Sequence, residues 1–289
     1  MATASEWLAG ARPRTLPAAV APVLVGTGAA AQVDAAHGGR ALLAAGVALA
    51  LQVAVNYAND YSDGVRGTDL NRVGPLRLTA SGTAPPSQVR TAAFLAIAVA
   101  GVLGMWLIVL TSAWWLAAVG VLCVVAAWTY TGGKRPYGYL GLGEVGVFLF
   151  FGLVAVLGTT YTQAGRVTWP AVLGAVAIGL LACALLMVNN LRDVPTDVLA
   201  GKRTLAVRLG DRRARRLYAV MVVLPVLLGA ACAVVAPWSL LVLLLLGPAA
   251  LLAGGVLAGA RGIALVPVLG GTGLLELAFG MLLGLGLSL

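Results

Sequence analysis

Two stretches of the sequence combine asparagine and aspartate at helical spacing, and their side chains are well suited to chemistry. The first contains Asn56, Asn59, Asp60 and Asp63, and Asp69 follows it. Residues three or four positions apart lie on neighbouring faces of a helix, so their oxygens become neighbours if the helix continues. Carboxylate and amide oxygens suit Mg²⁺, which keeps several waters and completes its shell with substrate phosphate oxygens.

A second stretch further along the chain repeats this pattern. Asn189, Asp193 and Asp197 are four residues apart, and Asn190 adds another amide. Pro195 removes one backbone hydrogen bond, which allows the helix to kink or restart between the two aspartates. A helix end capped by Asp and Asn is an ordinary alternative for either stretch alone. Two stretches of the same form instead favour a site that binds one diphosphate through two or more Mg²⁺ ions.

The composition excludes a water-soluble globular protein. Of 289 residues, 61% are hydrophobic and 10% charged, whereas soluble domains are about half apolar and a quarter charged. The formal net charge of +9 indicates an anionic membrane face or an anionic substrate, and no basic run with aromatics suggests nucleic-acid binding. The three cysteines, Cys123, Cys183 and Cys232, lie in apolar runs without metal-ligand spacing, which argues against metal binding by cysteine and against a disulfide framework.

Apolar runs long enough to span a bilayer follow one another along most of the chain. A hydrocarbon core of about 30 Å requires roughly 20 apolar helical residues. We therefore expect an all-α polytopic membrane protein in which about nine transmembrane helices form one bundle and a single domain over residues 1–289. The predicted spans are residues 15–31, 41–60, 91–111, 113–130, 143–161, 169–190, 217–235, 238–257 and 263–288.

The basic residues predict the orientation of these spans. If the N-terminus is cytoplasmic, every Lys and Arg except Arg40 and Arg166 falls on the cytoplasmic side, as the positive-inside rule requires. The C-terminus of a nine-span protein then lies outside. Both Asn/Asp stretches fall at the cytoplasmic ends of spans, so we expect a multi-pass protein of the plasma membrane with its active site facing the cytoplasm.

Four ordered stretches resemble a known family. They are RPRTLPAAVAPVLVG at 12–26, NDYSDGVRGTD at 59–69, YTGGKRPYGYLGLGE at 130–144 and NNLRDVPTDVLAGKRTL at 189–205. Together they are similar to the motifs of the UbiA superfamily of intramembrane aromatic prenyltransferases. They most resemble the branch that acts on 1,4-dihydroxy-2-naphthoate in menaquinone biosynthesis. The resemblance implies transfer of a polyprenyl chain from an all-trans polyprenyl diphosphate to that acceptor, with loss of CO2 and diphosphate, to give demethylmenaquinol.

The resemblance also implies roles for particular residues. Six residues are expected to ligate Mg²⁺: Asn59, Asp60, Asp63, Asp69, Asp193 and Asp197. Gly67 occupies a place where the superfamily often has a third aspartate, which leaves the contribution of Asp69 open. Lys134 is expected to stabilise the departing diphosphate, and Tyr130 to stabilise the allylic cation through its ring. Substrate binding is expected at Arg14, Asn56, Arg66, Arg72, Arg135, Tyr137, Asn190 and Lys202, with Arg12 and Arg77 as further candidates for the acceptor carboxylate.

Other functions remain possible from the sequence alone. A related enzyme could prenylate 4-hydroxybenzoate, homogentisate or a porphyrin. A transporter of an anionic substrate is a more distant alternative, but the acidic stretches lie at one membrane face rather than at mid-bilayer. Glu276, deep in the last predicted span, is either a functional residue or a protonated carboxyl group that is hydrogen-bonded to a neighbouring helix.

Overall fold

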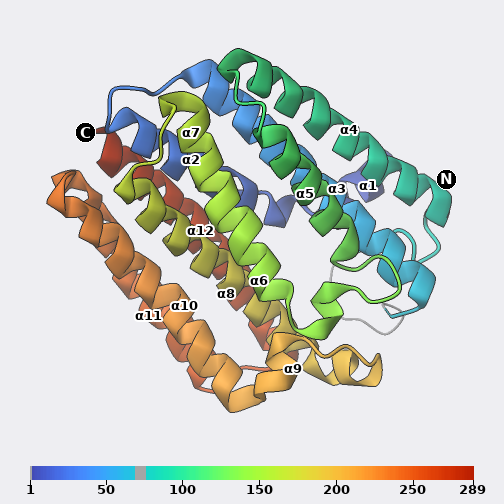
Figure 1. Cartoon of the computed structure of the whole chain (residues 1–289). Coiled ribbons are helices and arrows are strands. Elements are labelled where there is room, and N and C mark those ends of the chain that lie inside the picture. Colours follow the sequence, from blue (N-terminus) through green and yellow to red (C-terminus); the bar gives the residue numbers. More distant parts are fainter. Residues whose placement is uncertain (1, 69–75) are drawn as a thin grey trace.

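The computed structural model describes residues 2–68 and 76–289, and in this part of the chain it contains helices and no strands (Figure 1). The N-terminal elements are α1 (Ala4–Gly10), η1 (Pro13–Thr15), α2 (Pro17–Ala31), α3 (Gly38–Arg66), α4 (Pro86–Thr111), α5 (Leu116–Thr129), η2 (Tyr137–Leu140), α6 (Gly143–Val147), η3 (Phe148–Val154) and α7 (Ala155–Ala164). The C-terminal elements are α8 (Trp169–Leu199), α9 (Leu205–Leu209), α10 (Asp211–Ala231), η4 (Cys232–Val234), η5 (Pro237–Leu245), α11 (Leu246–Leu257), η6 (Gly262–Ala264) and α12 (Leu265–Ser288).

Each predicted apolar run corresponds to a helix or to consecutive helical segments. In the described part of the chain, seven helices are long and apolar enough to cross a membrane, and α6, η3 and α7 count there as one helix. The other two apolar helices, α2 and α5, have 15 and 14 residues. The protein is therefore a multi-pass membrane protein, whereas nine complete spans remain a prediction.

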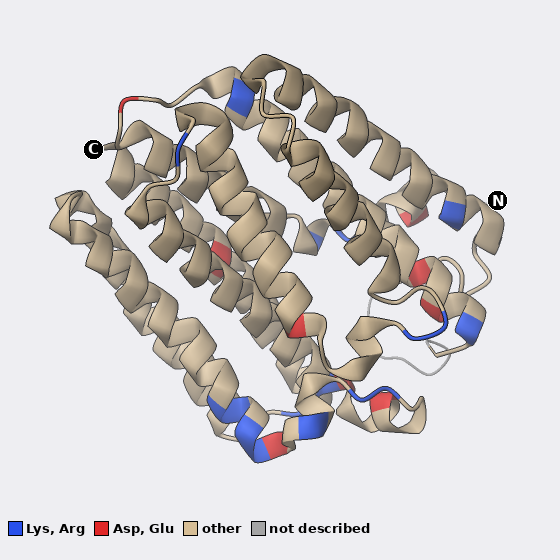
Figure 2. Ribbon diagram, in the orientation of Figure 1, with Lys and Arg blue, Asp and Glu red and all other residues tan. Residues whose placement is uncertain are grey.

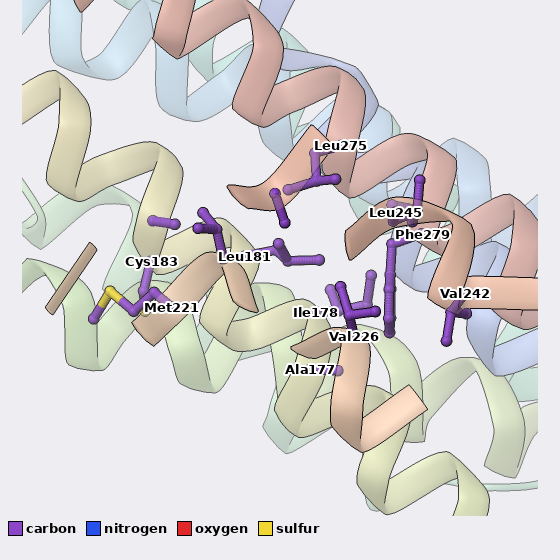
Figure 3. Close-up of a cluster of buried hydrophobic side chains, with 14 of the residues drawn as sticks. Ala177, Ile178, Leu181, Cys183, Met221, Val226, Val242, Leu245, Leu275 and Phe279 are labelled. Carbon is purple, nitrogen blue, oxygen red and sulfur yellow. The ribbon is translucent and has the colours of Figure 1, made fainter. Parts of the chain in front are cut away.

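Helix α8 is the centre of the bundle. In its most apolar stretch 67% of the residues are buried inside the protein, against 22% for α4. It packs against α10, η3, α12, α2 and α7, with α10 and α11 on one side of it in Figure 1 and α3 to α5 on the other. The close-up in Figure 3 shows side chains of α8, α10, η5 and α12 meeting in one core, among them Ile178, Leu181, Val226, Val242, Leu275 and Phe279.

The other side of the bundle is packed less tightly. Helix α5 contains no buried residue, although it contacts α3 and α4. A helix that is apolar all round but not buried by protein faces either lipid or an internal space. Many of the α5 side chains line a cavity that lies between this helix and α7 and α8.

The two Asn/Asp-bearing helices end in the same way. Helix α3 ends at Arg66 and is followed by Gly67 (φ 72°). Helix α8 ends at Leu199, and Gly201 (φ 71°) follows one residue later. This left-handed backbone region favours glycine, which has no Cβ. In each case the next residue donates its N–H to the carbonyl five positions back, in the pattern of a Schellman motif: Thr68 to the Asp63 carbonyl (3.1 Å) and Lys202 to the Asp197 carbonyl (2.8 Å).

Charged residues gather at the end of the bundle where α3 and α8 terminate. Figure 2 shows basic and acidic residues along that end, near α9 and the start of α10, and few at the opposite end. Helix α8 continues through Pro195 to Leu199, so the helix does not restart between Asp193 and Asp197. Both Asn/Asp stretches therefore lie on continuous helices at the same end of the bundle.

Candidate active site

A cavity of about 1440 Å³ extends between α2, α3, α4, α5, α7, α8 and α12. It exceeds the roughly 300–1,000 Å³ of most small-ligand pockets. On α3 its lining extends from Ala44 to Asp63, or about 28 Å at a rise of about 1.5 Å per residue. One end is polar and the remainder is largely apolar. The predicted site residues that line it are Arg12, Arg14, Asn56, Asn59, Asp63, Arg77, Tyr130, Tyr137, Asn190, Asp193, Asp197 and Lys202.

The end of α3 presents Asn59 and Asp63 to this cavity, one helical turn apart. The Asn59 Oδ1 atom accepts a hydrogen bond of 2.8 Å from the Thr131 hydroxyl. One oxygen of Asp63 accepts a 2.5 Å hydrogen bond from Tyr139, and the other lies 3.5 Å from Lys202 Nζ. The two oxygen-bearing side chains are therefore held in fixed orientations by groups from later parts of the chain.

Asp60 is turned away from the cavity, although it lies between these two residues in sequence. Its two carboxylate oxygens accept hydrogen bonds from the backbone N–H groups of Leu78 (2.8 Å) and Thr79 (2.9 Å). The residue is 1% exposed and does not line the cavity. Asp60 thus holds the segment that brings Arg77 to the cavity wall, and the metal-ligand role expected from the motif stays a prediction.

The end of α8 contributes two carboxylates and two amides. The Asp193 carboxylate accepts two hydrogen bonds from Arg192, at 2.7 and 2.8 Å, and the same guanidinium donates to Asn189 Oδ1 at 2.9 Å. Asn190 donates a 3.1 Å hydrogen bond to the buried carboxylate of Glu144 in α6. Since a side-chain amide that donates from its nitrogen is fixed in rotation, Glu144 determines where the Asn190 oxygen points.

The predicted cations fall into two groups. Lys202 lines the cavity and neighbours Asp63. Lys134 and Arg135 are exposed and do not line it, so direct contact with a leaving group in the cavity stays a prediction for both. Arg66 donates to the carbonyls of Thr131 and Gly133, which anchors the loop after α5 to the end of α3 rather than presenting a donor to the cavity.

The segment ahead of α2 brings two arginines to the polar end. Arg12 and Arg14 line the cavity around η1. The Asn56 amide nitrogen donates to the Ala11 carbonyl (2.9 Å) and to the Thr15 hydroxyl (3.0 Å). The Asn56 side chain therefore holds this arginine-bearing turn in place, in addition to lining the cavity itself.

Three tyrosines and the η3 segment form the aromatic part of the wall. The rings of Tyr130 and Tyr137 meet edge to face with centroids 5.4 Å apart. Burial raises the pKa of Tyr137 to about 12. Burial, and then the nearby Asp63 charge, raise the pKa of Tyr139 above its ordinary value, so this phenol keeps its proton and donates at neutral pH. The π-helical turn η3 adds Phe150 and Phe151.

Sequence reasoning missed several contributors. Tyr139, Glu144 and Arg192 all lie inside the motif stretches at 130–144 and 189–205, so position within a motif was the available signal. Their roles depend on partners more than forty residues away or on side-chain direction, which spacing does not reveal. The predictions for Asp69 and Arg72 lie outside the described residues.

Glu276 in α12 is fully buried and does not line the cavity. Within residues 2–68 and 76–289, its two carboxylate oxygens have no hydrogen-bond partner. The hydrogen bond to a neighbouring helix that the sequence suggested as one alternative is therefore not formed there.

The donor set at the polar end fits Mg²⁺. Asp63, Asp193 and Asp197 offer carboxylate oxygens, and Asn59 and Asn190 offer amide oxygens, all on the cavity wall. Among the described residues no three carboxylate, His or Cys side chains converge into a complete metal cage. Mg²⁺ commonly binds through one or two carboxylates together with waters and substrate phosphates, so an open arrangement of this kind is what a metal–diphosphate complex requires.

The fold and the site together define a polytopic membrane protein that can bind a long apolar molecule with an anionic head. The polar end supplies oxygen ligands and cations, and the rest of the cavity supplies apolar surface. The chain belongs to the UbiA prenyltransferase family, whose model matches residues 19–285.

Named relatives and solved structures agree with this assignment. The chain is 52% identical over 281 residues to the 1,4-dihydroxy-2-naphthoate octaprenyltransferase of Mycobacterium tuberculosis, covering 97% of this chain and 96% of that protein. It is 41% identical to the Escherichia coli protein of the same name, covering 74% and 72%. A solved structure also matches, that of a UbiA homolog from Archaeoglobus fulgidus bound to GPP and Mg²⁺. Its TM-score is 0.68 at 15% identity, and the match covers 96% of this chain and 99% of that one. This similarity establishes the shared fold.

Proposed function

We propose that this protein transfers the polyprenyl chain of an all-trans polyprenyl diphosphate to 1,4-dihydroxy-2-naphthoate. One carbon–carbon bond forms on the aromatic ring, diphosphate and CO2 are lost, and the product is demethylmenaquinol. The observation that carries this proposal is the 52% identity, over 97% of the chain, to a protein named for that reaction. The cavity supports it, because its polar end and long apolar remainder match the two parts of the donor.

The diphosphate belongs at the polar end. Asp63, Asp193 and Asp197, with Asn59 and Asn190, would hold Mg²⁺ there. When bound, Mg²⁺ supplies Lewis-acid stabilisation of negative charge on the departing diphosphate. Lys202 lies beside Asp63 and adds a donor whose attraction to the diphosphate grows as its charge develops. Asp60 is not included among these proposed ligands, because it is 1% exposed and does not line the cavity.

The cavity wall favours ionisation of the donor over its hydrolysis. Cleavage of the allylic carbon–oxygen bond leaves positive charge on the isoprenoid, which water would quench. The Tyr130 and Tyr137 rings line the wall next to the polar end, where a π face attracts a cation without reacting as water does. The apolar lining from α4, α5 and α7 keeps water from the chain.

The acceptor is an aromatic carboxylate and needs a cation. Arg12 and Arg14 reach the polar end from η1, and Arg77 reaches it from the segment held by Asp60. A guanidinium group binds a carboxylate through two parallel hydrogen bonds, which fixes the orientation of a planar acceptor. The three arginines are therefore the candidates for positioning the ring carbon against the isoprenoid cation.

The proposal includes an orientation in the membrane. Nine helices would span the plasma membrane as one domain, with the N-terminus in the cytoplasm and the C-terminus outside. This arrangement is supported by the sequence, in which only Arg40 and Arg166 fall on the outer side, and by the gathering of charged residues at the cavity's polar end (Figure 2). The active site would then face the cytoplasm.

Product formation by the purified protein tests the reaction. The protein in detergent is given 1,4-dihydroxy-2-naphthoate and a polyprenyl diphosphate, with Mg²⁺ or with excess chelator, and the products are identified by mass spectrometry. We expect a prenylated, decarboxylated quinol only when Mg²⁺ is present. Prenylation of 4-hydroxybenzoate instead would contradict the proposed acceptor, and no reaction with any aromatic acceptor would contradict prenyl transfer itself.

A further inference from the structure

Tyr139 connects separate parts of the site. Its hydroxyl donates to Asp63 Oδ1 at 2.5 Å and lies 3.2 Å from the Thr68 hydroxyl, both at the end of α3. Its carbonyl accepts a 2.9 Å hydrogen bond from the backbone N–H of Arg203, in the loop after α8. The Lys202 ammonium group lies 4.6 Å from the centre of its ring. Tyr139 also lines the cavity.

Lys202 extends this connection to the second aspartate-bearing helix. Its backbone N–H donates to the Asp197 carbonyl at 2.8 Å, and its ammonium group lies 3.5 Å from Asp63 Oδ2. The side chain is largely buried, with 11% exposure. A flexible lysine at a helix end has many rotamers open to it, and fixing one of them costs side-chain entropy. The Tyr139 ring and the Asp63 carboxylate together confine the Lys202 ammonium group to the cavity side.

We propose that Tyr139 is a positioning residue that holds the Asp63 carboxylate and the Lys202 ammonium group side by side, facing the diphosphate end of the cavity. The inference deepens the proposed function and rests on it. The hydroxyl fixes the rotation of a carboxylate ligand, which is how outer-shell hydrogen bonds orient metal ligands. The ring attracts the lysine through its π face.

The substitution Tyr139→Phe separates the contribution of the hydroxyl from that of the ring. Tyr139→Phe keeps the ring beside Lys202 and removes only the donor to Asp63. Loss of an outer-shell partner typically costs about 10–100-fold in metal affinity. We therefore expect the Mg²⁺ concentration for half-maximal binding to rise by about tenfold or more, with the fold intact. Tyr161→Phe is the matched control, because Tyr161 lies at the far end of α7 and packs on Trp115.

The test is a binding measurement that does not depend on turnover. Isothermal titration of the full-length protein in lipid nanodiscs with inorganic diphosphate, at a series of Mg²⁺ concentrations, gives the Mg²⁺ requirement of wild type, Tyr139→Phe and Tyr161→Phe. Thermal unfolding without Mg²⁺ checks that the three proteins are equally folded. Steady-state kinetics then separates the prenyl diphosphate KM from kcat.

We expect Tyr139→Phe to raise the Mg²⁺ requirement and the KM, with an unfolding midpoint like that of wild type and with Tyr161→Phe unchanged. An unaltered Mg²⁺ requirement in Tyr139→Phe would overturn the positioning role even if turnover fell. A lowered unfolding midpoint together with an unaltered requirement would assign the residue to folding. Failure of the wild-type protein to bind diphosphate with Mg²⁺ would instead overturn the proposed function, and this inference with it.

Discussion

The C-terminal ends of α3 and α8 have the same local backbone geometry, but the side chains around them differ. In α3 the series is Asn59, Asp63, Gly67, and in α8 it is Asp193, Asp197, Gly201, each with steps of four residues. Both glycines have positive φ values, and both helices close with the same backbone hydrogen-bond pattern. Asp63 and Asp197 are therefore equivalent positions, and Asn59 is the equivalent of Asp193.

The residues around these equivalent positions differ. Asp60 corresponds to Val194, a partly buried residue that packs against the apolar core. A carboxylate at that rotation of α3 points at the backbone of the following segment and not at the cavity. The additional charge of Asp193 relative to Asn59 is balanced by Arg192, its immediate neighbour. The comparison shows that distance from the terminating glycine, rather than membership of an Asp-rich motif, decides which oxygen faces the cavity.

Replacing Asp63 or Asp197 with asparagine tests whether the two positions are equivalent. Both variants remove one negative oxygen ligand from the cavity wall, so we expect turnover at saturating Mg²⁺ to fall by a similar factor, about 10²–10³. The rate of product formation at matched folded protein concentration is the measurement. Near-wild-type turnover of either variant would refute the assignment of that residue to the metal.

The role of Glu144 tests whether the amides of α8 need support as those of α3 do. Glu144→Leu removes the acceptor for Asn190, and we expect a rise of about 10–100-fold in the Mg²⁺ concentration needed for half-maximal activity. Glu144→Gln is the control, since its amide oxygen can still accept from Asn190. Equal behaviour of the two variants would show that the hydrogen bond does not position the amide.

Asp60 offers the sharpest contrast with Asp63. In Asp60→Ala the N–H groups of Leu78 and Thr79 lose their acceptor, at a cost of about 1–3 kcal/mol for each group left unsatisfied. We expect the thermal unfolding midpoint to fall more than in Asp63→Asn, and turnover measured below that midpoint to fall less. The reverse ranking would place Asp60 among the metal ligands.

Pro195 lies in α8 and has no proline counterpart in α3. Of the four tests, its replacement is expected to change turnover least. Pro195 is exposed, and α8 passes through it without ending. Pro195→Ala restores a backbone donor one turn beyond Leu191. We expect turnover to stay within about twofold of wild type, because Pro195 is exposed and does not line the cavity, and most surface substitutions change energies by less than about 0.5 kcal/mol. A larger loss would mean that the proline sets the direction of Asp197.

Much of the fold could be predicted from the sequence, because hydropathy and helical period are local properties. Each predicted apolar run corresponds to helix, and most acidic and basic residues lie at one end of the bundle. Pro195 was the local feature that spacing could not settle, because a proline can either end a helix or be accommodated at its surface. The spacing of Asn59 with Asp63, and of Asp193 with Asp197, was sufficient to put each pair on one face of its helix, and both pairs line the cavity.

Only the tertiary structure decided which of several similar residues line the cavity and which do not. The rotation of α3 against the segment at Leu78 turned Asp60 away, and the folding of the loop after α8 brought Lys202, but not the exposed Lys134, to the cavity. Tyr139 lies 76 residues from its partner Asp63. The physical reason is that a helix period fixes which residues share a face, whereas packing between distant segments fixes what that face meets.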